Sequence, residues 1–267
     1  MSTDKVMQKI MPPTVVVVGG MDPSGGAGLC ADIQTLSAMG CHAAPVATAI
    51  TVQDTATVKK YQLLETDLVR QQLQVVLDDL SPTVIKTGML ATGEVIAMLA
   101  DVLRQYPALK LVVDPVMRSN YNKSLSEDSL VSAMKALLLP IATLITPNLP
   151  EAEILSGTQK DADQCAARLA DVDCFITGTH ADSGPVINRY YQRGRKQREW
   201  KWERLPFDYH GSGCTLASAI AAGMARGMAM EQALQQAQQF VMESLQTGFK
   251  PGHGQYLPNR LSAVKNY

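Results

Sequence analysis

The sequence lacks several features that would place it in a class of proteins at once. No uninterrupted apolar stretch approaches the roughly 18 residues of a membrane span. The segment Met1–Thr14 has no apolar centre of the kind that a secretory signal peptide needs. The net charge is only −1, which argues against a nucleic-acid or anionic-membrane partner. We therefore expect no nucleic-acid partner and no membrane association.

Cysteine is scarce and scattered. The chain has 5 cysteines, and their spacing suggests neither a metal site nor a disulfide framework. Reduced thiols in a cytoplasmic protein are the simpler interpretation. The sequence also lacks a linker rich in proline, glycine and serine, and it has no block of like charge. Residues 1–267 are therefore expected to form a single domain, with residues 1–12 flexible.

What the sequence does contain is a regular alternation of short β-branched runs and helical patterns. The expected strands cover Thr14–Val18, Ala43–Ala49, Val84–Lys86, Leu109–Val113, Thr143–Ile145 and Cys174–Ile176. The expected helices cover Gly28–Met39, Thr66–Leu80, Gly93–Arg104, Glu127–Leu138, Cys214–Met228 and Met230–Leu245. Strands that alternate with helices of this length predict βαβ crossovers and a mainly parallel sheet with helices on both faces.

The segment Val186–Trp202 breaks this rhythm. Two β-rich pieces flank a turn that is rich in basic residues, a pattern typical of a hairpin. The basic side chains are Arg193, Arg195, Lys196 and Arg198. The turn either folds over the phosphates of a ligand or is a solvated turn, which is the commoner case.

The loop Gly19–Gly28 follows the first expected strand. Ligands of open α/β sheets bind outside the carboxyl ends of the strands, and glycines let a ligand approach the backbone closely. The loop is not a Walker A motif, and its spacing does not fit GxGxxG. A ligand loop and a purely structural turn therefore both remain open.

Polar residues follow two later strands. Asp114 ends one strand, while Asn148 and Glu151 follow the next. Such hard oxygen groups suit Mg²⁺, often through waters, with nucleotide phosphates completing its shell. Alternatively, Asn148 and Glu151 only cap the helix that follows them.

The segment Gly211–Leu216 brings two glycines and a serine to the start of a helix. Free N–H groups and the positive end of the helix dipole favour an anion there, including a phosphoryl group in transfer. A helix N-terminus also lowers the pKa of a thiol, so Cys214 is either a reactive thiolate or a small packed residue. Met89, after the short strand at Val84–Lys86, is either a flexible wall for a ring or an ordinary core methionine.

Together these segments resemble the ribokinase-like superfamily, and within it the hydroxymethylpyrimidine/phosphomethylpyrimidine kinases of thiamine biosynthesis. The resemblance spans nearly the whole chain. It is carried by DPSGGAG (Asp22–Gly28), TAITVQDT (Thr48–Thr55), IKTGML (Ile85–Leu90), VVDPVM (Val112–Met117), TPNLPEA (Thr146–Ala152) and HGSGCTLASAIAAG (His210–Gly223).

The resemblance implies a three-layer α/β/α sandwich with a central, mostly parallel sheet. It implies ATP as phosphoryl donor, Mg²⁺, and a homodimer. The acceptor would be 4-amino-5-hydroxymethyl-2-methylpyrimidine and commonly its monophosphate. Gln53 would read the amino and ring-nitrogen edge of the pyrimidine, since an amide both donates and accepts.

Further roles follow from the same resemblance. The substrate pocket would be completed by Gly20, Ala27, Asp32, Met89 and Val116. The anion hole would be formed by Gly211, Ser212 and Gly213, and Cys214 would stand where most of the superfamily has a catalytic Asp. Asn148 and Glu151 would organise Mg²⁺, with Asp114 nearby.

The sequence departs from the family at Thr177. The family usually has a Lys here that contacts the nucleotide phosphates, and a charge-assisted bond of that kind is worth about 1.5–3 kcal/mol. Two alternatives to an active pyrimidine kinase therefore remain. One is a pyridoxal kinase-like enzyme with a shifted substrate, and the other is a catalytically weak protein that binds or senses the pyrimidine.

Overall fold

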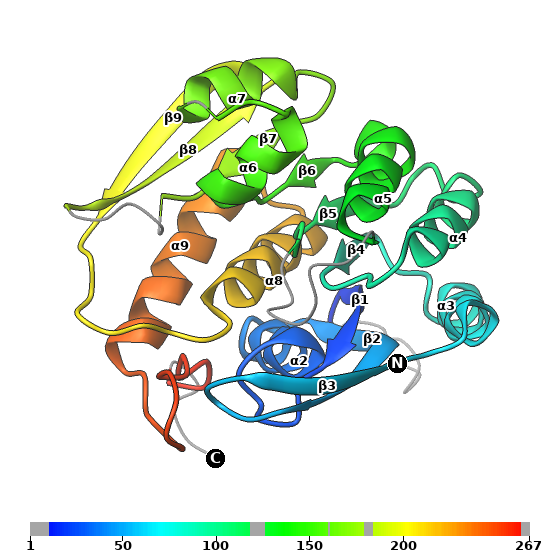
Figure 1. The fold of residues 1–267 in the computed structure, drawn as a ribbon, viewed down its shortest axis with the longest axis horizontal. Helices are drawn as coiled ribbons and strands as arrows, with labels where there is room; N and C mark the ends of the chain where they lie inside the picture. Colours follow the sequence, from blue (N-terminus) through cyan, green and yellow to red (C-terminus); the bar gives the residue numbers. More distant parts are fainter. Residues whose placement is uncertain (1–10, 118–125, 160, 179–183, 263–267) are drawn as a thin grey trace, which may run out of the picture.

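The computed structural model describes residues 11–117, 126–159, 161–178 and 184–262. All of its named strands belong to one nine-stranded sheet, ordered β3-β2-β1-β4-β5-β6-β7-β8-β9 (Figure 1). The strands are β1 (Thr14–Met21), β2 (His42–Gln53), β3 (Val58–Leu63), β4 (Val84–Thr87), β5 (Lys110–Val113), β6 (Leu144–Ile145), β7 (Cys174–Ile176), β8 (Val186–Gln192) and β9 (Arg195–Trp202).

The six central strands, from β2 to β7, run parallel, and β3, β8 and β9 add antiparallel edges. The centre of the sheet is buried on both faces, which is why its strands read as continuous β-branched runs. In β1, Val16 and Val18 point into one hydrophobic core, and Val15 and Val17 point into the other.

Helices cover both faces of the sheet, so the predicted three-layer α/β/α sandwich is confirmed (Figure 1). One core takes its helical residues from α3, α4, α6 and α7, and the other takes them from α2, α8 and α9. The helices are α2 (Gly28–Ala38), α3 (Thr66–Leu80), α4 (Gly93–Leu103), α5 (Ser126–Ala133), α6 (Leu149–Ser156), α7 (Ala162–Arg168), α8 (Ser212–Ala225) and α9 (Met230–Gln246).

Several elements differ from the prediction, and α6 and α7 are not among the expected helices. The edge strand β3 is not expected from the sequence, because Lys59, Lys60 and Gln62 are exposed and the strand carries no buried apolar run. The predicted helix at Glu127–Leu138 is α-helical only in α5, and a π-helical turn (Met134–Leu138) and a short 3₁₀ turn (Leu139–Ile141) follow it.

The predicted hairpin is confirmed as β8 and β9, but the structure contradicts the idea that its basic turn covers a ligand's phosphates. β8 runs antiparallel to β7, so the turn at Arg193 returns to the amino end of β7, where the Arg193 N–H donates to Asp173 Oδ1 at 3.3 Å. Lys196 pairs with Asp163 at 3.3 Å and Arg198 with Glu231 at 3.2 Å. These basic groups therefore lie at the sheet edge opposite the expected site.

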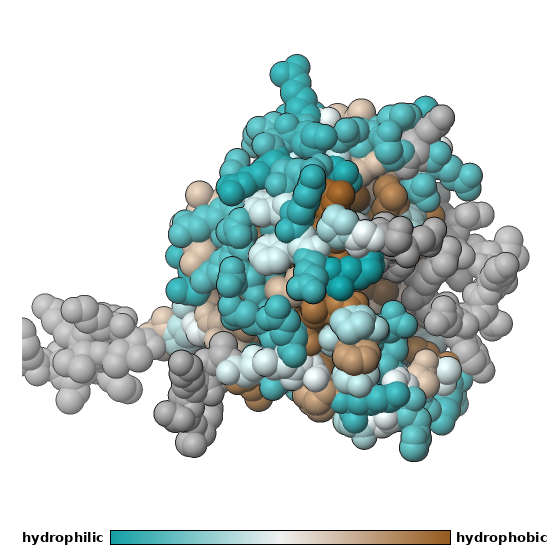
Figure 2. All heavy atoms as spheres, turned by 90° about the vertical axis from the view of Figure 1, so that its left-hand side faces the viewer, coloured by the Kyte–Doolittle hydropathy of each residue, from teal (hydrophilic) through white to brown (hydrophobic). Residues whose placement is uncertain are grey.

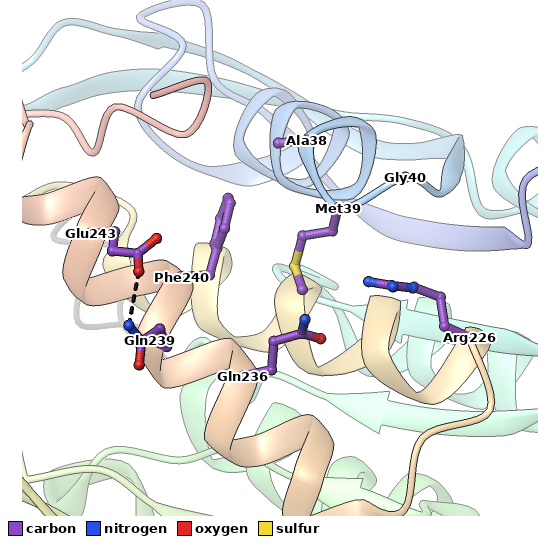
Figure 3. Close-up of a pocket in the computed structure, with 8 residues that line it drawn as sticks. All are labelled: Ala38, Met39, Gly40, Arg226, Gln236, Gln239, Phe240 and Glu243. Carbon is purple, nitrogen blue, oxygen red and sulfur yellow. Dashed lines mark hydrogen bonds between the residues drawn. The ribbon is translucent and has the colours of Figure 1, made fainter. Parts of the chain in front are cut away.

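A hollow of about 640 Å³ also lies at the amino edge of the sheet (Figure 3). It is lined by the carboxyl ends of α2 and α8 and by one side of α9, including Met39, Arg226 and Phe240. Because ligands of parallel sheets bind at the carboxyl edge, this hollow is not the predicted site.

Among the described residues, no helix is long and apolar enough to span a membrane.

Candidate active site

The predicted site residues converge on the carboxyl edge of the parallel strands. Gly20 lies near the end of β1, Gln53 ends β2, Asp114 follows β5, and Thr177 follows β7. Figure 2 views the molecule from the left of Figure 1, where the open end of the β8–β9 hairpin lies, and shows hydrophobic side chains in a band between hydrophilic ones. Residues far apart in the sequence thus meet because parallel strands end on one side.

The loop Asp22–Gly28 is held by the carboxylate of Asp22. Asp22 accepts hydrogen bonds from the N–H groups of Ser24 and Ala27, each at 2.8 Å. The backbone of Gly28 has φ +55°, and a Cβ there would lie 2.2 Å from the carbonyl oxygen of Gly20. Only glycine fits this close approach, so the glycines of the loop serve packing as well as ligand access.

The same loop packs against the start of α8. Gly211 has φ +83°, and a Cβ there would lie 1.9 Å from the carbonyl oxygen of Gly26. The first N–H groups of a helix have no carbonyl partner within it, and the first helical bond here is from Thr215 N–H to Gly211 at 3.0 Å. Gly213 is exposed, and no described atom lies within 4 Å of a Cβ built on it. An anion can therefore reach the helix start.

Cys214 is partly exposed in the first turn of α8, but it is not the thiolate that a helix N-terminus alone predicts. Burial raises the pKa of its thiol to about 12, and the carboxylates of Asp114 and Asp32 act in the same direction. Lys86 and a hydrogen bond from the Gly28 N–H oppose the rise without reversing it. The helix effect is thus outweighed, and the free protein carries a neutral thiol at neutral pH.

A buried cation lies next to Cys214. Lys86 in β4 is fully buried, and its Nζ lies 2.8 Å from Asp32 Oδ1 and 3.7 Å from Asp114 Oδ2. The Ser218 hydroxyl donates to the same oxygen of Asp32 at 2.7 Å. Desolvation lowers the pKa of Lys86, but its acidic neighbours raise that pKa by more than desolvation lowers it, so the side chain stays charged.

Asp32 therefore sits in the site differently from the other predicted pocket residues. Its exposed fraction is 0 %, and its carboxylate faces Lys86 and Ser218. Any effect of Asp32 on a ligand would act through Lys86 and not by contact. The sequence signal for this pair is the Lys within IKTGML (Ile85–Leu90), a residue without an assigned role in the resemblance.

The remaining pocket residues surround the carboxyl ends of β1 and β2. A Cβ on Gly20 would lie 3.2 Å from the sulfur of Met89, so the two residues are neighbours. The Met89 carbonyl accepts from the Thr48 hydroxyl at 2.7 Å, which fixes the loop. Ala27 and Val116 are partly exposed. Gln53 is partly exposed and contacts His210, a residue to which the sequence analysis assigned no separate role.

Asn148 and Glu151 form a capping box at the start of α6. The Asn148 side chain accepts from the Glu151 N–H at 2.9 Å, and the Glu151 carboxylate accepts from the Asn148 N–H at 2.9 Å. The capping interpretation is therefore correct. Asp114 Oδ2, on the neighbouring strand end, is buried without a hydrogen-bond partner among the described residues.

These donors fit Mg²⁺ only together with other ligands. In the part of the chain that the structure describes, no group of three His, Cys, Asp or Glu could hold a metal alone. Mg²⁺ commonly keeps several waters and takes one or two carboxylates plus substrate phosphates. The carboxylates of Asp114, whose Oδ2 accepts no hydrogen bond among the described residues, and of Glu151 suit that pattern.

Thr177 is buried and backbone-paired at the end of β7. Its N–H donates to the Pro147 carbonyl at 2.9 Å. Because the residue is a threonine, it supplies no ammonium group at this strand end. A different cation, Arg204, donates to the carbonyl of the next residue, Gly178, at 3.4 Å. The guanidinium of Arg204 thus lies beside the strand end where the family lysine would stand.

A second buried cation lies beside the start of α8. Arg260 is 2 % exposed and donates to Thr215 Oγ1 at 2.8 Å, to the carbonyl of Gly26, and to Gln34 Oε1 at 3.1 Å. These acceptors are uncharged, so the positive charge remains available to the electrostatic field of the site. Nothing in the local sequence around Arg260 pointed to this contact, because its partners are more than 40 residues away.

Comparison with known proteins gives one answer on the family. The sequence model of the phosphomethylpyrimidine kinase family matches residues 22–259. A hydroxymethylpyrimidine/phosphomethylpyrimidine kinase from Mycobacterium tuberculosis is 34 % identical over 252 residues, covering 91 % of this chain and 92 % of that protein. The range matched by the family model spans every motif that carried the resemblance.

Solved structures agree on the fold. The pyridoxal kinase from Staphylococcus aureus in complex with pyridoxal superposes with a TM-score of 0.86 at 31 % identity, covering 95 % of each chain. Other structures of that kinase hold ADP, or AMP-PCP together with pyridoxal. The phosphomethylpyrimidine kinase from Clostridium difficile 630 gives a TM-score of 0.73 at 30 % identity, covering 88 % of this chain and 99 % of that one.

The fold, the order of the motifs and the family match thus lead to the same assignment. The chain is a phosphotransferase with the ribokinase-like α/β fold, and it belongs to the phosphomethylpyrimidine kinase family of thiamine biosynthesis.

Proposed function

We propose that this protein transfers the γ-phosphoryl group of ATP to 4-amino-5-hydroxymethyl-2-methylpyrimidine and then to the resulting monophosphate. The observation that carries this proposal is the start of α8, where Gly211, Ser212 and Gly213 offer an accessible anion site beside Cys214. Similarity to the M. tuberculosis pyrimidine kinase supports the substrate. The nucleotide complexes of the S. aureus kinase support ATP.

In this mechanism the chain supplies position and charge. The N–H groups at the start of α8 stabilise the negative charge of the phosphoryl group in transfer, with the charge of Arg260 behind them. The acceptor ring lies among Gly20, Met89 and Gln53. Bound Mg²⁺ would be held through Asp114 and Glu151, with Asn148 orienting Glu151, and would neutralise the charge of the nucleotide phosphates.

Cys214 is placed to receive the proton of the acceptor alcohol. Its thiol is neutral in the free protein, so it acts as a base only when bound substrates favour the thiolate. A loose transition state tolerates this, because the alcohol does not need to lose its proton early. In the second step the nucleophile is a phosphate oxygen that is already anionic, and no base is required.

The test is a coupled assay of ADP release with three acceptors: the pyrimidine alcohol, its monophosphate and pyridoxal. We expect turnover with both pyrimidines and a kcat/KM for pyridoxal at least about tenfold lower. Turnover with neither pyrimidine would refute the proposal. A preference for pyridoxal would favour the alternative kinase reading, to which the structural similarity with pyridoxal kinases gives support.

The catalytically weak alternative is motivated by Thr177. If the nucleotide KM is high, Thr177→Lys restores a charge next to the phosphates and should lower that KM by about tenfold, since a charge-assisted bond is worth about 1.5–3 kcal/mol. Thr177→Met is the matched control, with similar bulk and no charge. An unchanged KM in Thr177→Lys would show that other cations, with Arg204 foremost, already replace the lysine.

We also propose a homodimer, as the family resemblance implies. Met21 of β1 and Ile50 and Val52 of β2 are 40 %, 51 % and 55 % exposed, and Met21 pairs with Ile50 in the sheet, so they form a continuous apolar surface. Light scattering should give twice the mass of the chain. Ile50→Lys should shift the protein toward the monomer.

A further inference from the structure

The imidazole of His210 lies between the carboxylate of Asp22 and the amide of Gln53. His210 Nε2 is 3.0 Å from Asp22 Oδ2 and 3.3 Å from Gln53 Nε2. The side chain of Asp22 is 4 % exposed and that of His210 is 27 % exposed. The ring is wedged in place, since a Cβ on Gly26 would lie 2.4 Å from its Cδ2. One nitrogen of His210 thus faces two partners at once.

Only one of these two contacts can be satisfied with the atoms as assigned. The Asp22 carboxylate accepts two backbone N–H groups at 2.8 Å and is ionised, so it can only accept from His210. His210 Nε2 must therefore carry a hydrogen, and it has no lone pair for the NH₂ group of Gln53. The oxygen and nitrogen of an amide are exchanged by a half-turn. When Gln53 turns its oxygen to the ring, the single Nε2–H is shared between Asp22 Oδ2 and the Gln53 oxygen as a three-centre hydrogen bond, and both contacts are satisfied.

We propose that His210 is a positioning residue that fixes the amide of Gln53 with its oxygen toward the ring, and that this orientation selects the substrate edge. The oxygen keeps one lone pair for a ligand N–H, and the NH₂ group beside it donates to a ligand acceptor. An amide free to turn could present these groups in either order. Held by His210, Gln53 presents them in one order only.

This inference rests on the proposed pyrimidine substrate, and it names the chemical feature that the site reads. An amino group next to an unprotonated ring nitrogen matches the fixed amide. The 4-oxo analogue has the reverse pattern, with a carbonyl next to a ring N–H, and leaves buried groups unpaired. We expect wild-type kcat/KM for the 4-amino alcohol to exceed that for the 4-oxo alcohol by about 100-fold or more.

Two variants of His210 separate positioning from packing. His210→Gln places an NH₂ group near the site of Nε2, so it can still donate to both Asp22 and Gln53, and it should keep most of the discrimination. His210→Met fills similar space without a donor, so Gln53 can turn, and the amino-to-oxo ratio should fall at least about tenfold while kcat for the amino substrate falls less. An unchanged ratio in a folded His210→Met, or equal losses in both variants, overturns the proposal.

A second measurement needs neither turnover nor a variant. The ¹⁵N shifts and couplings of the His210 ring in the free wild-type protein, at about pH 8, report which nitrogen carries the hydrogen. We expect hydrogen on Nε2. A ring protonated only on Nδ1 would refute the positioning role of His210 even if the kinase assay succeeds. Conversely, hydrogen on Nε2 with no pyrimidine turnover would leave the positioning role intact and refute the proposed function.

Discussion

Asp22 and Cys214 are acidic groups of the same site whose pKa values move in opposite directions. Burial raises the pKa of Asp22, but hydrogen bonds from His210, Ser24 and Ala27 outweigh burial and bring it to about 2 from its ordinary 3.8. Cys214 has a weaker set of donors, so burial and the neighbouring carboxylates raise its pKa. The balance of donors and desolvation, and not the residue type, decides each charge state.

The lowered pKa of Asp22 predicts acid sensitivity. A group whose pKa is lower in the folded state stabilises the fold above its unfolded pKa, here by about 2 kcal/mol, and this contribution is lost as pH falls from about 4 to about 2. Asp22→Asn should therefore be less stable by about 2 kcal/mol at pH 7, with the difference shrinking toward pH 2. Urea unfolding at both pH values measures it, and the exposed Asp171→Asn should change little.

Cys214→Ala separates the two phosphorylation steps. A positioned base contributes about 10²–10⁴-fold to a rate, so turnover of the pyrimidine alcohol should fall at least about 100-fold. Turnover of the monophosphate should fall less than about tenfold, because its nucleophile needs no base. Single-turnover assays with each acceptor test this. Equal losses in both steps would count against Cys214 as the base.

At the scale of elements, the ion pair of Lys86 and Asp32 joins the middle of the sheet to helix α2. β4 supplies Lys86, α2 supplies Asp32, and α8 adds Ser218 on the opposite side of the same carboxylate. Each partner is at most 1 % exposed in its side chain. The pair therefore fixes how α2 and α8, which begin at the active site, sit on the sheet.

Breaking this pair should be costly. Lys86→Met leaves the Asp32 charge buried without its partner, and we expect a loss of about 3–5 kcal/mol in the free energy of unfolding. Lys59→Met is the matched control: its bond to Asp54 is also short, at 2.9 Å, but both side chains are largely exposed, so about 0–1 kcal/mol is expected.

The double variant Lys86→Met/Asp32→Leu completes this test. It removes both charges and should be more stable than Lys86→Met alone, because no unpaired charge is then left in the core. Additive losses in the double variant would contradict the buried-pair account.

For the whole molecule, the chain end after α9 is part of the site. Arg260 connects this last segment to the Asp22–Gly28 loop through the carbonyl of Gly26, to α2 through Gln34, and to α8 through Thr215. The Tyr256 carbonyl also accepts from the His210 N–H at 2.9 Å. The segment thus packs against the start of α8 and the Asp22–Gly28 loop.

Arg260→Met should loosen this closure. The loss of several charge-assisted bonds should lower stability by about 3 kcal/mol, and chymotrypsin should cut after Tyr256 earlier than in the wild type. Arg260→Lys keeps the charge but loses the planar fork, so it should recover nucleotide KM more than stability. If the protease cuts both variants as slowly as the wild type, Arg260 does not have this closing role.

The sequence by itself determined the layout of the fold and the family. Alternating β-branched runs and helical periods are local patterns, and they correctly predicted the central strands, the hairpin and most helices. The motifs that follow strand ends, such as Asp114 and Thr146–Ala152, could be placed at one sheet edge because parallel strands end together. The edge strand β3 could not be predicted, because its sequence has no alternating or continuous run of buried apolar residues.

Only the tertiary structure decided the charge states and the partners across the sheet. The neutral thiol of Cys214 depends on burial and, to a smaller extent, on carboxylates from α2 and the end of β5. The contact of His210 with Gln53 spans 157 positions of sequence. The same holds for Arg260 and for the direction in which the basic hairpin turn points. Burial and electrostatics depend on distance in space, and the order of residues along the chain does not contain that distance until the chain has folded.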